Sequence, residues 1–354
     1  MEDVEIVPFD PKTVSRDEWR RFHASRRTRH AEETPDDPLT GDGKAEALMK
    51  RDNPEAEEFR WMAVDRASGA FVGELYFSVF KKTSPTYATN GHIAWLDVAV
   101  LAPYRRRGIG TRLFRMVPEL AARHGIRSFA GWVTLEDGKA FLPVIGAPVG
   151  SRRRENRLSL DRVDWPMVEG WRREGPSRSP GTSLRWLDGR IDEDILDRYA
   201  DLYTETGNQQ PRDGLDIGDF IRDRAWFEDR AEKFAAIGET WWSLAAVERD
   251  GAVSGLTEMI YEPEETDRIY QGLTGVREAY RGRGLGKWVK AEMLLRVRRE
   301  LPQVRIVSTW NATTNAAMLA INDALGFREN RVSEMPQMSV EALEAWLARG
   351  KTRA

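Results

Sequence analysis

The sequence has 354 residues, no cysteine, 31% charged residues and a formal net charge of −3. The length accommodates two domains of ordinary size, and the lack of cysteine excludes disulfides, thiolate metal sites and a cysteine nucleophile. The balanced charge argues against a general nucleic-acid binder, and no apolar run reaches the roughly twenty residues of a membrane span. The acidic N-terminus lacks the form of a signal peptide, so we expect a cytoplasmic protein. We also expect a monomer or homodimer with no metal, nucleic-acid or membrane partner.

The first half begins with a short strand at residues 5–8 and a polar, helical stretch at residues 14–49. That stretch is consistent either with a lid over a substrate or with two solvated helices. Residues 58–65 and 70–80 alternate as two strands around Ala67-Ser68-Gly69, which predicts a hairpin.

A strand ending at Val100 is followed by the basic turn Tyr104-Arg105-Arg106-Arg107-Gly108-Ile109-Gly110. Apolar residues at helical spacing then run to Gly125, where we expect the helix to stop. A further strand is predicted at residues 127–134. The turn is therefore placed between a strand and a helix.

Residues 171–182 combine Pro, Gly, Ser and charge without apolar periodicity, which predicts a linker. A strand at residues 183–187 and a helix at residues 193–203 follow, then an irregular loop and a helix ending near Ile237. Residues 241–248 and 252–261 flank Asp250-Gly251, a strong hairpin signal. The second half thus repeats the hairpin of the first.

The basic turn also occurs a second time, as Tyr280-Arg281-Gly282-Arg283-Gly284-Leu285-Gly286 after an apolar strand ending at Val276. A helical pattern begins at Leu285, so backbone N–H groups and positive partial charge meet the arginines there. Glycine lets a ligand approach the backbone closely, and the combination suits a pyrophosphate. The alternatives are two Gly-rich surface turns, or a dinucleotide-binding fingerprint, which fits worse because arginine precedes the glycines.

Arg-x-x-Gly-x-Gly between a strand and a helix resembles motif A of the GCN5-related N-acetyltransferases, the GNAT family. The segment from Asn311 to Phe327 resembles motif B of that family. Thr257-Glu258, the stretch from Gln271 to Val276, and the segment Asn311 to Asn322 are further similar to actinobacterial tandem GNAT proteins. The resemblance implies an α/β fold of two tandem GNAT domains, residues 1–170 and 183–354, each a mixed twisted sheet flanked by helices.

Members of the family bind acetyl-CoA, so the resemblance implies acetyl-CoA or another acyl-CoA as cofactor and a small-molecule amine as acceptor. Backbone groups of Thr274 and Val276 would hold pantetheine, and the Val276 N–H would stabilise the oxyanion. The implied cofactor contacts are Val100, Arg105, Arg106, Arg107, Gly108, Ile109 and Gly110 in the first half, and Thr274, Gly275, Val276, Arg281, Gly282, Arg283, Gly284, Leu285, Gly286, Asn311 and Asn315 in the second.

Glu258 is the candidate general base, because it lies on an otherwise apolar strand beside the strand that precedes the turn. Its alternatives are an outward-facing carboxylate or a buried ion pair. Gln271 is the candidate substrate contact.

The sequence departs from the family at three places. Leu135 and Leu142 replace the usual Asn and Tyr in the first half, so we expect that half to be degenerate and the C-terminal half to be catalytic. Asn322 stands where the family has a proton-donating Tyr, so CoA would leave as thiolate or another group would act. One alternative is a non-catalytic acyl-CoA-binding or sensor protein. Another is aminoacyl transfer from tRNA, which the near-neutral charge disfavours.

Overall fold

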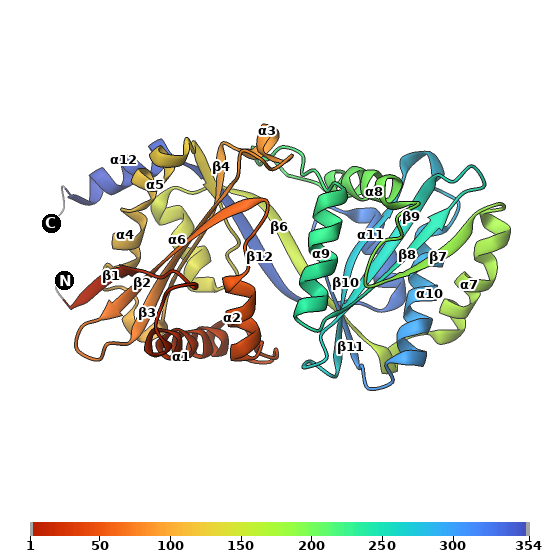
Figure 1. The fold of residues 1–354 in the computed structure, drawn as a ribbon, viewed down its shortest axis with the longest axis horizontal. Coiled ribbons are helices and arrows are strands. Elements are labelled where there is room, and N and C mark those ends of the chain that lie inside the picture. Colours follow the sequence, from red (N-terminus) through yellow and green to blue (C-terminus); the bar gives the residue numbers. More distant parts are fainter. Residues whose placement is uncertain (1–2, 352–354) are drawn as a thin grey trace. The chain divides into compact units, whose positions relative to one another are not determined.

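The computed structural model describes residues 3–351, which form two compact units (Figure 1). The N-terminal unit comprises the chain up to Arg152, the segment Arg212–Asp219 and the chain from Ser333 onward. The C-terminal unit comprises Arg153–Pro211 and Phe220–Val332. The units are therefore discontinuous in sequence, unlike the two contiguous domains that the sequence suggested.

The N-terminal unit contains a mixed sheet in the order β1-β2-β3-β4-β5-β12. Its pairs are antiparallel except for the parallel pair β4–β5. Its elements are β1 (Val4–Pro8), α1 (Arg16–Glu33), α2 (Asp42–Lys50), β2 (Ala56–Asp65), β3 (Phe71–Phe80), α3 (Tyr87–Asn90), β4 (Ile93–Val100), η1 (Ala102–Tyr104), α4 (Ile109–Phe114), α5 (Val117–His124), β5 (Ser128–Ala130), α6 (Glu136–Ile145) and α12 (Val340–Lys351).

The C-terminal unit repeats this plan with the order β6-β11-β10-β9-β8-β7, and its parallel pair is β10–β11. Two strands contribute to both units along their length, β6 (Val149–Ser159) and β12 (Arg328–Ser339). The remaining elements are η2 (Leu160–Arg162), α7 (Trp165–Arg178), β7 (Ser183–Asp188), α8 (Leu196–Asn208), α9 (Arg224–Ala236), β8 (Thr240–Val247), β9 (Val253–Tyr261), β10 (Arg268–Val276), η3 (Glu278–Tyr280), α10 (Leu285–Glu300), β11 (Ile306–Ala312) and α11 (Ala316–Leu325).

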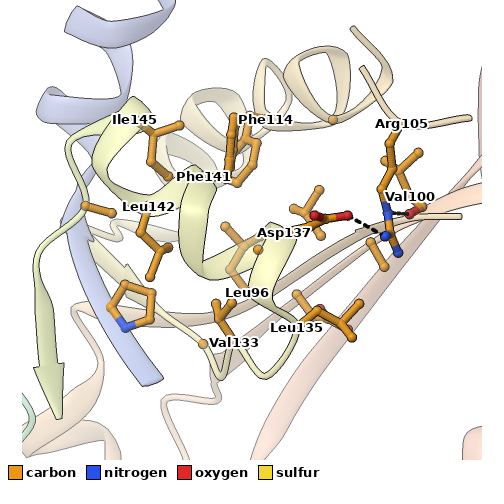
Figure 2. A pocket seen from close by; sticks show the side chains of 18 of the residues that line it. Leu96, Val100, Arg105, Phe114, Val133, Leu135, Asp137, Phe141, Leu142 and Ile145 are labelled. Atoms are coloured by element: carbon orange, nitrogen blue, oxygen red, sulfur yellow. Dashed lines mark hydrogen bonds and ion pairs between the residues drawn. The ribbon is translucent and has the colours of Figure 1, made fainter. Parts of the chain in front are cut away.

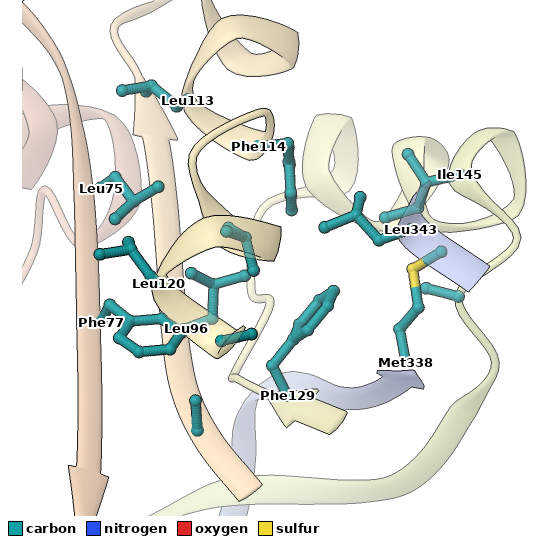
Figure 3. Packing of buried hydrophobic residues seen from close by; sticks show 14 of the residues in the cluster. Leu75, Phe77, Leu96, Leu113, Phe114, Leu120, Phe129, Ile145, Met338 and Leu343 are labelled. Atoms are coloured by element: carbon teal, nitrogen blue, oxygen red, sulfur yellow. The ribbon is translucent and has the colours of Figure 1, made fainter. Parts of the chain in front are cut away.

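Each sheet is covered on both faces by apolar clusters. In the N-terminal unit the larger cluster lies between the sheet and α4, α5, α6 and α12, and includes Phe77, Leu96, Phe114 and Phe129 (Figure 3). A smaller cluster around Phe22 packs α1 on the opposite face. In the C-terminal unit one cluster lies under α7 and α10, and another under α8 and α9. These opposed layers fix the strands that carry the candidate site.

The hairpins follow their local signals. β2 and β3 are joined through Gly69, and β8 and β9 through Gly251, both in the left-handed region that glycine tolerates. The helix predicted after the first basic turn is divided into α4 and α5, with Pro118 in the first turn of α5, and it stops at Gly125 as predicted. Proline lacks the N–H that would continue the helical ladder, which accounts for the division.

The predicted linker at residues 171–182 is wrong, because most of it belongs to helix α7. A Cβ at Gly175 would lie 2.3 Å from the ring of Trp288 on α10. Glycine therefore stands there because α7 approaches α10 closely, and not because the chain is extended.

None of the helices within residues 3–351 combines the length and the apolarity that crossing a membrane requires.

Candidate functional site

The N-terminal unit has a cavity where two parallel strands separate. β4 and β5 pair only from Ile93 to Trp95. Beyond Trp95, β4 continues to pair with β3, and the segment that follows β5 no longer pairs with β4. A Cβ at Gly131 would lie 2.0 Å from the Leu96 carbonyl oxygen, so only glycine fits at the point of separation. A cavity of about 660 Å³ occupies the opening, between β4, the first basic turn and α6.

The cavity has one polar and one apolar end (Figure 2). At the polar end, Arg105 Nε donates to the Val100 carbonyl at 2.9 Å, and its guanidinium donates to Asp137 at 2.8 Å and pairs with Glu32. Glu32 also accepts from the Ala102 backbone N–H at 2.8 Å. The arginine of this turn is therefore held by two carboxylates that an incoming phosphate would have to displace.

The two basic turns adopt the same backbone conformation. Gly108 and Gly284 precede their helices with φ of 78° and 80°, in the left-handed region. Two residues earlier, Arg106 and Gly282 also have positive φ, 62° and 77°. A non-glycine residue is strained in that region, so the third glycine of the C-terminal turn relieves a strain that the N-terminal turn keeps.

The strand before each turn directs backbone groups into the opening. Leu101 N donates to Val72 O in the N-terminal unit, and Arg277 N donates to Ser254 O in the C-terminal unit, both at 2.9 Å. Because backbone groups in an antiparallel strand point alternately to either side, those of Val100 point away from β3 and those of Val276 point away from β9. Val98 and Thr274 share this orientation, which is the one that a pantetheine arm would require.

The C-terminal unit has a bulge that the N-terminal unit lacks. Pairing between β10 and β9 shifts register between Gln271 and Thr274, whereas β4 pairs with β3 without interruption. β10 and β11 pair only as far as Tyr270 and Ser308, so these strands also separate. A bulge changes the direction of a strand, and this bulge lies where β10 and β11 stop pairing.

Gln271 braces the bulge. The side-chain Nε2 donates to Thr257 Oγ1 at 2.9 Å and to the backbone carbonyl of Glu258 at 2.7 Å. The backbone carbonyl of Gln271 accepts from Thr309 Oγ1 at 3.2 Å. The side chain is buried and its amide is occupied by these contacts. The geometry supports a role in holding β10, β9 and β11 together more than the direct substrate contact that the sequence suggested.

Glu258 lies inside a closed cluster of donors. Its carboxylate is fully buried and accepts from Trp241 Nε1 at 3.1 Å and from Tyr199 at 3.3 Å, and it pairs with Arg230 at 3.2 Å. Arg230 also donates to the hydroxyl of Tyr203 at 2.9 Å, and burial raises the pKa of Tyr203 to about 12. The structure therefore places Glu258 in a buried ion pair, one of the alternatives that the sequence left open, and its role as general base stays a prediction.

The arginines of the C-terminal turn have fewer acidic partners than Arg105 has in the N-terminal turn. Arg281 Nε donates to the Val276 carbonyl at 3.2 Å, as Arg105 does to Val100, and its other contact is the neutral amide of Gln209. Arg283 pairs with Glu248 at 3.3 Å. Among the described residues no carboxylate is paired with Arg281, so its charge is less neutralised than that of Arg105.

A buried polar network joins α10, α11 and β11. Lys290 Nζ donates to Asn322 Oδ1 and Asn322 Nδ2 donates to Asn311 Oδ1, each at 2.8 Å. Burial lowers the pKa of Lys290 to about 7. Asn315 caps α11 by accepting from Met318 N at 3.3 Å. The sequence identified the three asparagines but not Lys290, because a lysine one position after Val289 in a charged helix gives no signal of burial.

Comparison with known proteins identifies the class. Residues 17–141 match the model of the acetyltransferase (GNAT) family, so this part of the chain is a GNAT acetyltransferase domain. Its bounds include α1, the first basic turn and most of α6, which are the elements around the cavity. None of the curated proteins matches the sequence.

Solved structures show the same tandem fold over nearly the whole chain. A tandem GNAT protein from the clavulanic acid biosynthesis pathway is 23% identical, covering 95% of this chain and 98% of its own, with a TM-score of 0.73. A GCN5-related N-acetyltransferase from Sphaerobacter thermophilus is 14% identical, covering 96% of each chain, with a TM-score of 0.64. The predicted fold of two tandem GNAT domains is confirmed.

Proposed function

We propose that the protein is an acyl-CoA-dependent N-acetyltransferase that acetylates a small-molecule amine, and that transfer occurs in the C-terminal unit. The observation that carries the proposal is the combination at β10, where a bulge and outward-facing backbone groups lead directly into an arginine–glycine turn at the start of α10. The helix is long enough for its N-terminal N–H groups and dipole to favour an anion there. The residues present therefore suit a pyrophosphate followed by an amide-bearing arm.

In this mechanism each residue has a limited task. Arg281 and the turn around Gly284 would hold the pyrophosphate, and the backbone of Thr274 would hold the pantetheine arm. The Val276 N–H would donate to the carbonyl oxygen as the amine nitrogen attacks, the C–S bond breaks and CoA departs. Asn322 presents an amide to the region where the family has its proton donor, so CoA would leave as thiolate rather than take a proton from this residue.

The amine must lose its proton to form the amide. Because Glu258 is enclosed, we assign this step to water and expect the rate to rise with pH as more of the acceptor amine becomes neutral. An amine with an ordinary pKa is mostly protonated at neutral pH, so this dependence would follow the pKa of the acceptor and not that of an enzyme group.

The test measures binding and transfer separately. Acetyl-CoA should raise the melting temperature of the protein, and a panel of amines should include one that releases free CoA. Arg281→Glu should abolish turnover, while Arg105→Glu in the matching turn should leave it measurable. The opposite pattern would move catalysis to the N-terminal unit.

A second candidate function is a non-catalytic acyl-CoA-binding or sensor protein. The enclosed carboxylate of Glu258 and the non-acidic Asn322 favour it. Such a protein would show the acetyl-CoA thermal shift and release no CoA with any amine of the panel.

A further inference from the structure

The buried lysine of α10 has no role in the reaction proposed above. Lys290 is 1% exposed, its Nζ donates to Asn322 Oδ1 at 2.8 Å, and the ring centroid of Phe327 lies 5.4 Å from Nζ. An ammonium group has three N–H donors, so two of them are left without a hydrogen-bond partner in the part of the chain that the structure describes. A buried cation with incomplete hydrogen bonding is costly, and an anion nearby would offset that cost.

The surrounding elements supply no such anion. Burial alone lowers the pKa of Lys290, without a contribution from a neighbouring charge, and β11 carries no charged residue. The buried or interacting charges on α10 and α11 are engaged elsewhere, namely Asp323 with Arg154, Glu292 with Arg172 and Arg296 with Asp188. The remaining charged residues of α10 and the one after Phe327 are exposed, namely Lys287, Arg298, Arg299, Glu300 and Arg328. Within the described residues, Nζ therefore has no acidic partner.

Asn322 connects the lysine to the opening between β10 and β11. Its Nδ2 donates to Asn311 Oδ1 at 2.8 Å, and Asn311 lies on β11 beyond Ser308, where the pairing with β10 has ended. An amide nitrogen has two N–H donors, and the second one of Asn322 is not used by any residue that the structure describes. The network thus ends in an unused donor at the side of the opening.

The helix that carries this donor lies beside the proposed oxyanion donor. A Cβ at Gly286 would lie 3.5 Å from Ile321 Cδ1 and 3.8 Å from Val276 Cγ2. The first turn of α10, the end of β10 and the residue before Asn322 therefore meet at one place. Negative charge that develops next to the Val276 N–H would form close to α11.

We propose that Lys290 is a positioning residue for the leaving group, whose positive charge stabilises, through the amide of Asn322, the thiolate that departs during acyl transfer. The inference rests on the proposed function and deepens it, because that reaction lacks a proton donor for the sulfur. The bond to Nζ holds Oδ1 of Asn322 toward the lysine, which leaves the second Nδ2–H for sulfur. The amine nitrogen forms the C–N bond, the C–S bond breaks with its electron pair on sulfur, and the amine proton goes to water.

A charge is sufficient for this task, and a proton donor is not required. An ordinary thiol has a pKa of about 8.5, and a nearby opposite charge makes such a group about tenfold or more acidic. The effect is mutual, so a thiolate would also favour the charged form of Lys290 over the neutral form that burial favours. The lysine and the leaving group would thus ionise as a pair.

The experiment measures the ionisation of bound CoA, independently of acyl transfer. CoA bound to the full chain is titrated from about pH 6 to about pH 9, and the ultraviolet absorbance of its thiolate is recorded. The same titration with desulfo-CoA, which lacks the sulfur, is subtracted to cancel the signal of the tyrosines. At about pH 7.5, where Lys290 is only partly charged, the wild type should hold at least about twofold more thiolate than Lys290→Met.

Three further variants separate the charge from the shape of the side chain. Lys290→Gln keeps an N–H donor but has no charge, so it should match Lys290→Met, whereas a merely structural lysine would let it match the wild type. Lys290→Gln also replaces Lys290→Met in the comparison if the latter does not fold. Lys287→Met, at an exposed position of the same helix, should leave the thiolate fraction unchanged. Asn322→Leu should lose the effect, and adding Lys290→Met to it should change nothing more.

The pH dependence of turnover is a second measurement. In the wild type, kcat/KM should rise less steeply above about pH 7, because Lys290 loses its charge there while the acceptor amine becomes neutral. Lys290→Met should start from a lower rate and keep the steeper rise up to the pKa of the acceptor. Lys287→Met should reproduce the wild-type profile.

The outcomes separate this inference from the proposed function. Turnover of an amine with equal thiolate fractions in the wild type and Lys290→Met would overturn the inference and leave the acetyltransferase proposal standing. A thiolate fraction that depends on Lys290, without turnover of any amine, would refute the transferase and support the charge effect in an acyl-CoA-binding protein. Failure of CoA to bind would refute both.

Discussion

Replacement of Lys290 by Met should make the stability of the protein less dependent on pH. The folded pKa of about 7 lies below the ordinary value of 10.5, and burial is the cause. Between these two values the unfolded chain binds more protons than the folded chain, so the free energy of unfolding rises with pH. Below about pH 7 the cost of burying this group is fully present, and above about pH 10.5 it is absent.

The expected size follows from single-site linkage. With the two pKa values above, the free energy of unfolding of the wild type should rise by roughly 2 kcal/mol between pH 7 and pH 9 from this group alone. Lys290→Met keeps a side chain of similar length and removes the titration. The variant also loses the hydrogen bond to Asn322. That loss changes the free energy of unfolding by the same amount at both pH values, so it does not change the dependence of the free energy on pH.

The assay is urea unfolding followed by tryptophan fluorescence at pH 7, 8 and 9 for the wild type and the variant. Subtracting the free energy of unfolding of the variant from that of the wild type at each pH cancels the contribution of every other titrating group. Lys287→Met on the same helix is the control, because Lys287 is exposed and should reproduce the wild-type slope. Parallel slopes for the wild type and Lys290→Met would refute the reasoning and mean that Nζ is solvated or paired with a carboxylate.

Four other substitutions have clear expectations. Glu258→Gln should lower the free energy of unfolding by about 3–5 kcal/mol, because it leaves Arg230 buried without its counter-charge, while the folded fraction keeps its turnover. A loss of turnover by a factor of a hundred at unchanged melting temperature would instead establish Glu258 as the base. Adding Arg230→Met to Glu258→Gln should restore most of the stability, as measured by the same unfolding assay. Gly131→Ala should cost about 1–3 kcal/mol or more because its Cβ meets the Leu96 carbonyl, whereas Gly43→Ala, with open space around it, should be neutral or stabilising by thermal melting.

The features that the sequence predicted correctly depend on short-range signals. Asp250-Gly251 determines a hairpin, Gly125 ends a helix, and the two arginine–glycine turns form between a strand and a helix. Each of these needs only the conformational freedom of glycine or the periodicity of its neighbours. The identity of the fold could therefore be inferred from local patterns that occur twice.

The strands β6 and β12 were missed because their role depends on distant residues. Both segments are rich in Arg and Glu, which does not resemble a buried strand. Glu155 on β6 is nevertheless buried, because Arg157 and Arg331 neutralise it at 3.1 Å and 2.7 Å. The partners of β6 and β12, in β11 and β5, lie far away in the sequence, so no window of the sequence reveals the pairing.

The candidate site shows the same limit at the level of side chains. The sequence placed a carboxylate on an apolar strand, but could not show that Arg230 and Tyr199, from two helices, would enclose it. The two units also differ from each other in this region. The C-terminal unit has a bulge in β10 and an enclosed Glu258, whereas β4 of the N-terminal unit pairs without interruption and Arg105 is paired with two carboxylates. Each of these differences depends on contacts between segments that are distant in the sequence, which is why the sequence alone did not predict them.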